Sequence, residues 1–156
     1  MNNAFSQMVS IIIAVIIMCF MPLCFLYGRI DNLRQIYVLT ETEYFIDSIC
    51  NTGFVSKEMY DGYIRAIGNK GAVYEVDITR ETPVYTLTDT GYELSKDYYG
   101  NEEIVSEIEE SGRYYFSQGD FVRAQVKKVS DINVFSIFGN EVRECYYGGQ
   151  IKYEAY

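Results

Sequence analysis

The feature that most constrains this chain is an apolar run from Met8 to Leu26, and no charged side chain precedes Arg29. A helix of these nineteen residues is about 28 Å long at about 1.5 Å per residue, close to the roughly 30 Å hydrocarbon thickness of a bilayer. A helix buried in a soluble domain is seldom so long without a charge. The sequence therefore predicts an N-terminal stub and one transmembrane helix within residues 1–28, with about 128 residues following on one side of the membrane.

The run does not have the pattern of a cleaved signal peptide. No Lys or Arg precedes it, it exceeds the roughly 7–15 residues of a signal core, and no small-residue cleavage site follows it. The residues before Cys24 are also too bulky for a lipoprotein signal. We therefore expect an uncleaved anchor, in which Cys19 and Cys24 act as small apolar residues.

The orientation of this anchor stays open from charge alone. Arg29 and Arg34 follow the run closely, whereas the stub carries only its terminal amine. A count of positive charges would place the large domain in the cytoplasm, but long domains translocate largely regardless of charge.

The residues after position 28 carry every charge, 13 basic and 22 acidic, and the net charge is −9. Such a domain lacks the concentrated basic surface that nucleic acids require. The chain has no His and shows no P-loop, dinucleotide, zinc or EF-hand pattern. The carboxylates between Glu102 and Glu110, and those of Glu41, Glu43 and Asp47, fit solvated helix faces better than catalytic or metal sites. We expect no catalytic residue, no cofactor and no metal site.

Helical periodicity continues beyond the membrane run. Neither Pro nor Gly occurs between Arg29 and Ser48, and an apolar stripe falls within about 60° of arc, formed by Ile30, Leu33, Tyr37 and Tyr44. The pattern predicts one helix over roughly residues 5–49, with residues 29–53 as a stalk that Gly53 ends. Inside the membrane, Ala14, Pro22 and Gly28 are the candidate points for packing against other helices.

Residues 54–156 are predicted to form one α+β domain built on an antiparallel sheet. Helical spacing indicates short helices over 56–68, with Ser56 as N-cap, over 102–110, capped by Asn101, and over 131–138. Alternating apolar and polar residues indicate strands over 74–79, 84–88, 114–116, 121–129 and 142–156, the last broken at Gly148–Gly149. Residues 89–100 are expected to form a loop. The 16 tyrosines suit half-buried strands, and a dedicated tyrosine-lined binding face is the alternative.

Two cysteines, Cys50 and Cys145, lie in the polar part of the chain. If that part is outside the cell they could form a disulfide, closing a loop of about 96 residues worth about 4–5 kcal/mol in chain entropy. Two unrelated free thiols are the alternative.

Several stretches of the polar part together carry a family resemblance: 45–53, 55–60, 71–76, 112–116 and 119–124. They resemble small TadE-like or pseudopilin-like membrane proteins of Gram-positive tight-adherence clusters, which are similar to type IVb pilus or type II secretion systems. The resemblance implies a pilin-like fold, an extracytoplasmic domain and a role in assembling a surface filament or secretion apparatus. It also implies an assembly ATPase, polytopic platform proteins and other pilin-like subunits as partners. The chain departs from pilins in having no Gly before Gly28 and no acidic residue before Asp31.

The resulting expectation is a non-catalytic, membrane-anchored accessory or pseudopilin-like subunit of a surface pilus or secretion assembly. Three alternatives stay open: a membrane-tethered extracytoplasmic binding or sensing module, a cytoplasm-facing accessory protein of a conjugation or secretion complex, and an enzyme.

Overall fold

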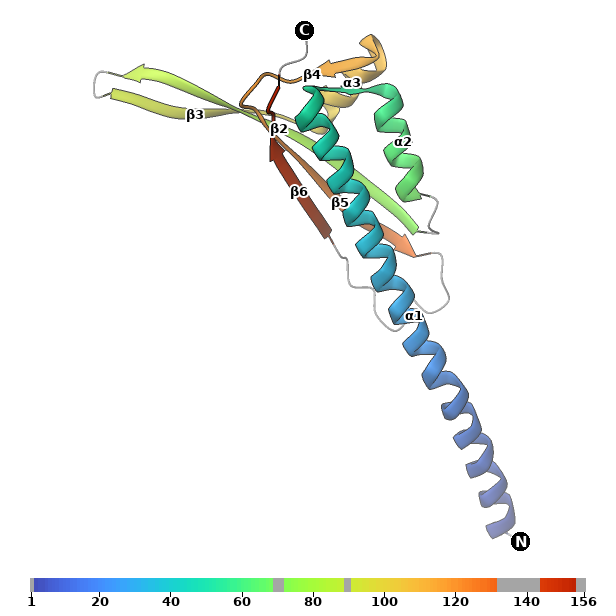
Figure 1. Ribbon diagram of the computed structural model, residues 1–156. Coiled ribbons are helices and arrows are strands. Elements are labelled where there is room, and N and C mark those ends of the chain that lie inside the picture. Colours follow the sequence, from blue (N-terminus) through green and yellow to red (C-terminus); the bar gives the residue numbers. More distant parts are fainter. Residues whose placement is uncertain (1, 69–71, 89–90, 132–143, 154–156) are drawn as a thin grey trace. The chain divides into compact units, whose positions relative to one another are not determined.

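The computed structural model describes residues 2–68, 72–88, 91–131 and 144–153, which form an α+β protein (Figure 1). The chain divides into two compact units, Met1–Ile36 and Tyr37–Tyr156. Helix α1, Asn2–Thr52, begins in the first unit and ends in the second, so the predicted long helix is confirmed. The division falls earlier than the predicted end of the stalk at residue 53, because the last turns of α1 contribute side chains to the core of the second unit.

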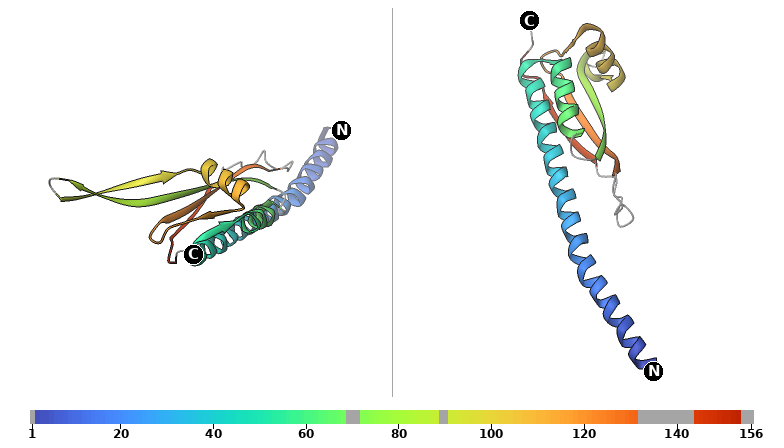
Figure 2. Two further views of the ribbon diagram at one scale, coloured as in Figure 1. Left: turned by 90° about the horizontal axis from the view of Figure 1, so that it is seen from above. Right: turned by 90° about the vertical axis from the view of Figure 1, so that its right-hand side faces the viewer.

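The second unit contains an antiparallel sheet with the strand order β3-β2-β5-β6 (Figure 2). Its strands are β2 (Ala72–Thr88), β3 (Gly91–Tyr99), β5 (Phe121–Asp131) and β6 (Glu144–Gln150). Two short strands, β1 (Phe54–Ser56) and β4 (Arg113–Tyr115), pair separately. The short helices are α2 (Lys57–Gly68) and α3 (Asn101–Ser111). The predicted α+β class with an antiparallel sheet is confirmed.

The predicted strand pair 74–79 and 84–88 is wrong, because both segments belong to the single strand β2. Its partner is β3, which lies in the stretch predicted to be a loop. Pro83 interrupts the sequence pattern but not the strand. Pairing between β2 and β5 ends at Glu81 opposite Phe121, so the missing N–H of Pro83 can face a side of β2 on which no described strand lies.

The ends of the short helices follow their local sequence with one exception. The backbone N–H of Met59 donates to Ser56 Oγ at 3.2 Å, which confirms the predicted N-cap of α2. Gly112, with φ of 78°, ends α3, and its N–H donates to the carbonyl of Ile108. At the other end of α3, Gly100 holds the N-cap position in place of Asn101.

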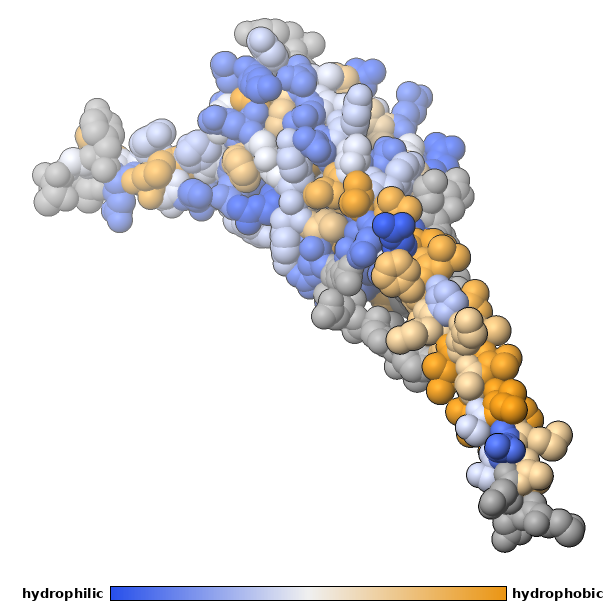
Figure 3. Space-filling view, turned by 60° about the horizontal axis from the view of Figure 1, so that its bottom comes forward, coloured by the Kyte–Doolittle hydropathy of each residue, from blue (hydrophilic) through white to orange (hydrophobic). Residues whose placement is uncertain are grey.

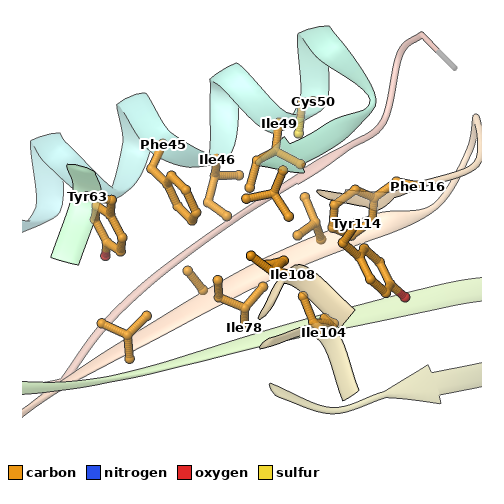
Figure 4. Packing of buried hydrophobic residues seen from close by; sticks show 14 of the residues in the cluster. Phe45, Ile46, Ile49, Cys50, Tyr63, Ile78, Ile104, Ile108, Tyr114 and Phe116 are labelled. Carbon is orange, nitrogen blue, oxygen red and sulfur yellow. The ribbon is translucent and has the colours of Figure 1, made fainter. Parts of the chain in front are cut away.

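The core of the second unit lies where the helices meet the inner face of β2 and β5 (Figure 4). On α1 the buried face is spaced by three and four residues and differs from the predicted apolar stripe, since Tyr44 is 74% exposed. On β5 the predicted alternation is confirmed, with Val122, Ala124 and Val126 buried and Arg123 and Lys127 exposed. The buried positions on α1 are Val38, Thr42, Phe45, Ile46, Ile49 and Cys50.

The last strand is shorter than predicted and is not broken at its two glycines. Gly148 and Gly149 lie inside β6, where their lack of side chains permits close packing. A Cβ on Gly148 would lie 3.0 Å from the ring of Phe121, and one on Gly149 would lie 2.8 Å from Cys50 Sγ. The helix predicted over 131–138 lies outside the described residues, apart from Asp131 at the end of β5.

Candidate functional site

The first candidate site is the N-terminal part of α1, in the first unit. Its best window of 18 residues has a mean hydropathy of 2.9, and none of that window is buried. Figure 3 shows hydrophobic side chains along this part of the helix. The helix is therefore long and apolar enough to span a membrane, a property that anchors and signal sequences share.

The three residues predicted to pack against other membrane helices all lie exposed on this segment. Ala14, Pro22 and Gly28 fall within about 120° of one helix face at about 100° per residue. Pro22 sits inside the helix without ending it, and a Cβ on Gly28 would meet nothing within 4 Å. A close approach of another helix at these positions stays a prediction.

The second candidate is a charged centre in the second unit, Tyr37–Tyr156, which is called the head below. Sequence reasoning missed this centre. Arg80 Nε on β2 lies 2.7 Å from Asp120 Oδ2, and the side chains are 15% and 1% exposed. The guanidinium also donates to Tyr114 OH at 3.0 Å and lies over three aromatic rings, with centroid distances of 5.0 Å to Tyr99, 5.8 Å to Tyr114 and 5.9 Å to Phe116. The sequence signal was weak, a Gly-Asp turn and one arginine in an alternating strand.

The groups of this centre are engaged with one another. Burial lowers the pKa of Arg80, but the hydrogen bond that its guanidinium donates to Tyr114 OH and the charge of Asp120 outweigh this effect, so the pKa is raised and Arg80 stays charged. Asp120 Oδ2 also accepts the backbone N–H of Ser117 at 2.8 Å. The Asp120 carbonyl accepts the N–H of Ile151 at 2.8 Å. This arrangement ties β2 to the turn before β5 and suits a structural role.

The third candidate is an open cleft of about 640 Å³ beside the start of α3. Among the described residues, no group of three or more His, Cys, Asp or Glu is placed to hold a metal ion. Glu102 and Glu103 are exposed there, as predicted for a solvated helix face, and Tyr98 contributes an aromatic ring. The cleft is lined by Glu75, Val76, Asp77, Tyr98, Gly100, Asn101, Glu102, Glu103, Gln125 and Lys127.

The structure does not bring the two predicted disulfide partners together. Cys50 and Cys145 are both free, and Cys50 packs against Gly149. Cys145 lies four residues earlier in β6, about 13 Å along the strand, whereas a disulfide needs Cα atoms within about 7 Å. Burial raises the pKa of both thiols, and Asp47 raises that of Cys50 further. Both are therefore weak nucleophiles at neutral pH.

Comparisons of the chain with protein-family models, curated proteins and solved structures find no match. The architecture itself is pilin-like, since a long N-terminal helix with an apolar first part packs its last turns on an antiparallel sheet.

Proposed function

We propose that this chain is a membrane-anchored, non-catalytic accessory or pseudopilin-like subunit of a surface pilus or secretion assembly, with its C-terminal domain outside the cytoplasm. The observation that carries the proposal is one continuous helix with two different environments. The first part of α1 exposes apolar side chains, and the last turns of the same helix lie in the core of a folded head.

The exposed part of α1 needs an apolar environment. Burial of a large apolar side chain stabilises a protein by about 1.5–3 kcal/mol relative to leaving it in water. On α1, Ile11, Ile16 and Met18 are 63%, 58% and 80% exposed. Lipid supplies this environment, and so do other apolar helices. Helices associate in lipid through small residues that let their backbones approach closely. We assign this role to Ala14 and Gly28, together with Pro22, where the helix can kink. The proposed partners are therefore membrane lipid, other pilin-like subunits and platform proteins.

The features of the head support a non-catalytic role. Its buried ion pair has its hydrogen bonds satisfied within the fold, and its two thiols have raised pKa values. The ion pair connects parts of the fold, and the raised pKa values leave neither thiol prepared as a nucleophile.

The test is site-specific photocrosslinking in living cells, with the photoreactive amino acid at Ala14. We expect crosslinks to other membrane proteins of the assembly at this position. The matched control is Ile16, which is about 200° away on the helix and should crosslink mainly to lipid. Crosslinks to lipid alone at both positions contradict membership of an assembly.

The orientation is tested separately with Ser106→Cys on the exposed surface of α3. A membrane-impermeant maleimide should label this thiol in intact cells as fully as in permeabilised cells. Labelling only after permeabilisation contradicts an extracytoplasmic head and favours the cytoplasm-facing alternative.

The cleft beside α3 favours a second candidate, a membrane-tethered binding module. In that case a photoreactive residue at Gln125, on the cleft wall, captures a partner while Ala14 reaches only lipid. The opposite result favours the assembly subunit.

A further inference from the structure

The strands β2 and β3 extend beyond the rest of the sheet as a two-stranded arm, at the left of Figure 1. Pairing between β2 and β5 stops at Glu81, whereas pairing between β2 and β3 continues to Thr88 opposite Gly91. The arm consists of residues 82–88 and 91–97. A two-stranded hairpin is marginally stable by itself in water, so an arm of this length gains from a partner.

One face of the arm is apolar and exposed. Tyr85 and Leu87 are 70% and 78% exposed, and their spacing of two residues puts them on the same face. Leu94 is directly opposite Tyr85 in the register and is 56% exposed, so it lies on that face too.

The arm also has a free edge on β2. The N–H of Ile78 points toward the β3 side, since it donates to Asn101 Oδ1 at 3.2 Å just beyond the end of β3. Backbone groups alternate sides along a strand, so those of Pro83, Tyr85 and Leu87 point the other way. Along Val84–Thr88 that side faces no described strand. Tyr85 and Leu87 therefore offer two N–H groups and two carbonyls to a partner strand.

The occupant that best fits this edge is a second copy of the chain. Two copies carry the same net charge of −9 and repel, but Val84–Thr88 contains no charged residue. The outer edge of the arm is different, because β3 carries Glu93, Lys96 and Asp97, and charges of this kind discourage strand pairing. The uncharged edge is also self-complementary, because an antiparallel alignment centred on Thr86 places Tyr85 opposite Leu87 of the second copy.

We propose that Val84–Thr88 of two copies pair edge to edge and antiparallel about a two-fold axis at Thr86. The arms then form a four-stranded sheet in the order β3-β2-β2-β3, with four backbone hydrogen bonds between Tyr85 and Leu87 of the two copies. In this register the residues before Pro83 run past the end of β2 in the other copy, and the pairing of β5 with β2 ends at Glu81, so β5 does not occupy the edge of Val84–Thr88. The interface is isologous, as expected for a homodimer.

The test is oxidative crosslinking of the full chain in membranes. Thr86→Cys is introduced in a background in which the four native cysteines, Cys19, Cys24, Cys50 and Cys145, are replaced by alanine. Residue 86 forms a non-hydrogen-bonded pair with itself, with Cα atoms about 4.5 Å apart, which is within the range for a disulfide. We expect a disulfide-linked dimer.

Ser95→Cys is the matched control, because Ser95 is opposite Val84 on the same arm. In the proposed dimer the two β3 strands are separated by three strand spacings, about 14 Å, so this variant should stay monomeric. Crosslinking at Ser95→Cys without crosslinking at Thr86→Cys would show that β3 edges pair, and overturns the proposal. Absence of crosslinking at both sites also overturns it.

A second variant separates pairing from folding. Leu87→Pro removes an N–H that the pairing of β2 with β3 does not use. The native Pro83 already lacks an N–H on the same edge. Leu87→Val is the control, because it keeps the N–H. Added to Thr86→Cys, Leu87→Pro should lower the crosslinked fraction about tenfold, because two of the four bonds between copies are lost. Leu87→Val should leave it unchanged, and both should unfold at the temperature of the parent. Equal crosslinking with proline contradicts edge pairing.

Discussion

The hydroxyl of Tyr63 lies in the core, where α2 meets α1. Thr42 Oγ1 donates to the carbonyl of Val38 at 2.7 Å, so its oxygen accepts the proton of Tyr63 OH, also at 2.7 Å. The Tyr63 ring stacks on Phe45 with centroids 4.4 Å apart. The side chain is 5% exposed, and burial raises the pKa of Tyr63 to about 12.

This raised pKa predicts a loss of stability at alkaline pH. The folded state keeps the Tyr63 proton above pH 10, where the unfolded state releases it, so the contribution is fully present below about pH 10 and is lost as pH rises through about 12. The loss is about 2–3 kcal/mol. Urea unfolding of the full chain in detergent at increasing pH measures it. Tyr63→Phe should be less stable at pH 8 by about 1 kcal/mol and should lose less between pH 10 and 12. Parallel pH profiles for the two proteins contradict the assignment.

A second residue-scale prediction concerns the contact between Gly149 and Cys50. A Cβ at position 149 would lie 2.8 Å from Cys50 Sγ, closer than atoms pack, so Gly149→Ala should destabilise the head by about 1–3 kcal/mol. Adding Cys50→Ala removes the sulfur and should restore part of that loss. Chemical denaturation of the two single variants and the double variant gives the coupling energy. Strictly additive effects would show that the two residues do not touch.

At the scale of elements, the Arg80–Asp120 pair connects β2 to the turn before β5. Asp120→Asn removes the carboxylate and leaves a largely buried guanidinium without its counter-charge, which should cost about 3 kcal/mol. The control is the exposed pair Lys96–Glu81, in which Lys96 is 62% exposed and Lys96→Gln should cost less than about 1 kcal/mol. Thermal unfolding in detergent compares the two variants. Similar small losses would mean that the buried pair contributes no more than a surface one.

The elements that could be predicted from the sequence are those set by short-range patterns. The helix α1, the cap at Ser56 and the alternation of β5 follow from spacing within about ten residues. The hairpin of β2 and β3 was missed because a proline ordinarily interrupts a strand. The strand β2 accommodates Pro83 because its pairing with β5 ends before this position, at Glu81. The pairing of Arg80 with Asp120 joins residues that only the folded sheet brings together, so no local pattern indicates it.

At the scale of the whole molecule, the sequence predicted the long apolar helix more fully than any site in the head. The apolar run is a local property of composition, whereas the cleft, the charged centre and the positions of the thiols depend on which strands become neighbours. The thiols illustrate this dependence. Cys50 does contact β6, as a disulfide with Cys145 would require, but it contacts Gly149. Which residue of β6 lies beside Cys50 depends on how the strand is aligned in the folded sheet.

The last prediction tests the membrane segment in the full chain. Alkaline carbonate should leave the wild-type chain in the membrane pellet. Ile16→Lys combined with Ile17→Lys should move it to the supernatant, because two central lysines in place of isoleucines change the insertion free energy by about 6–8 kcal/mol. The matched control is Leu33→Lys combined with Ile36→Lys, which changes two exposed apolar residues of α1 beyond the uncharged run and should stay in the pellet. Release of the control as readily as the central variant would mean that the uncharged run does not hold the chain. Retention of both would mean that another part of the chain binds the membrane.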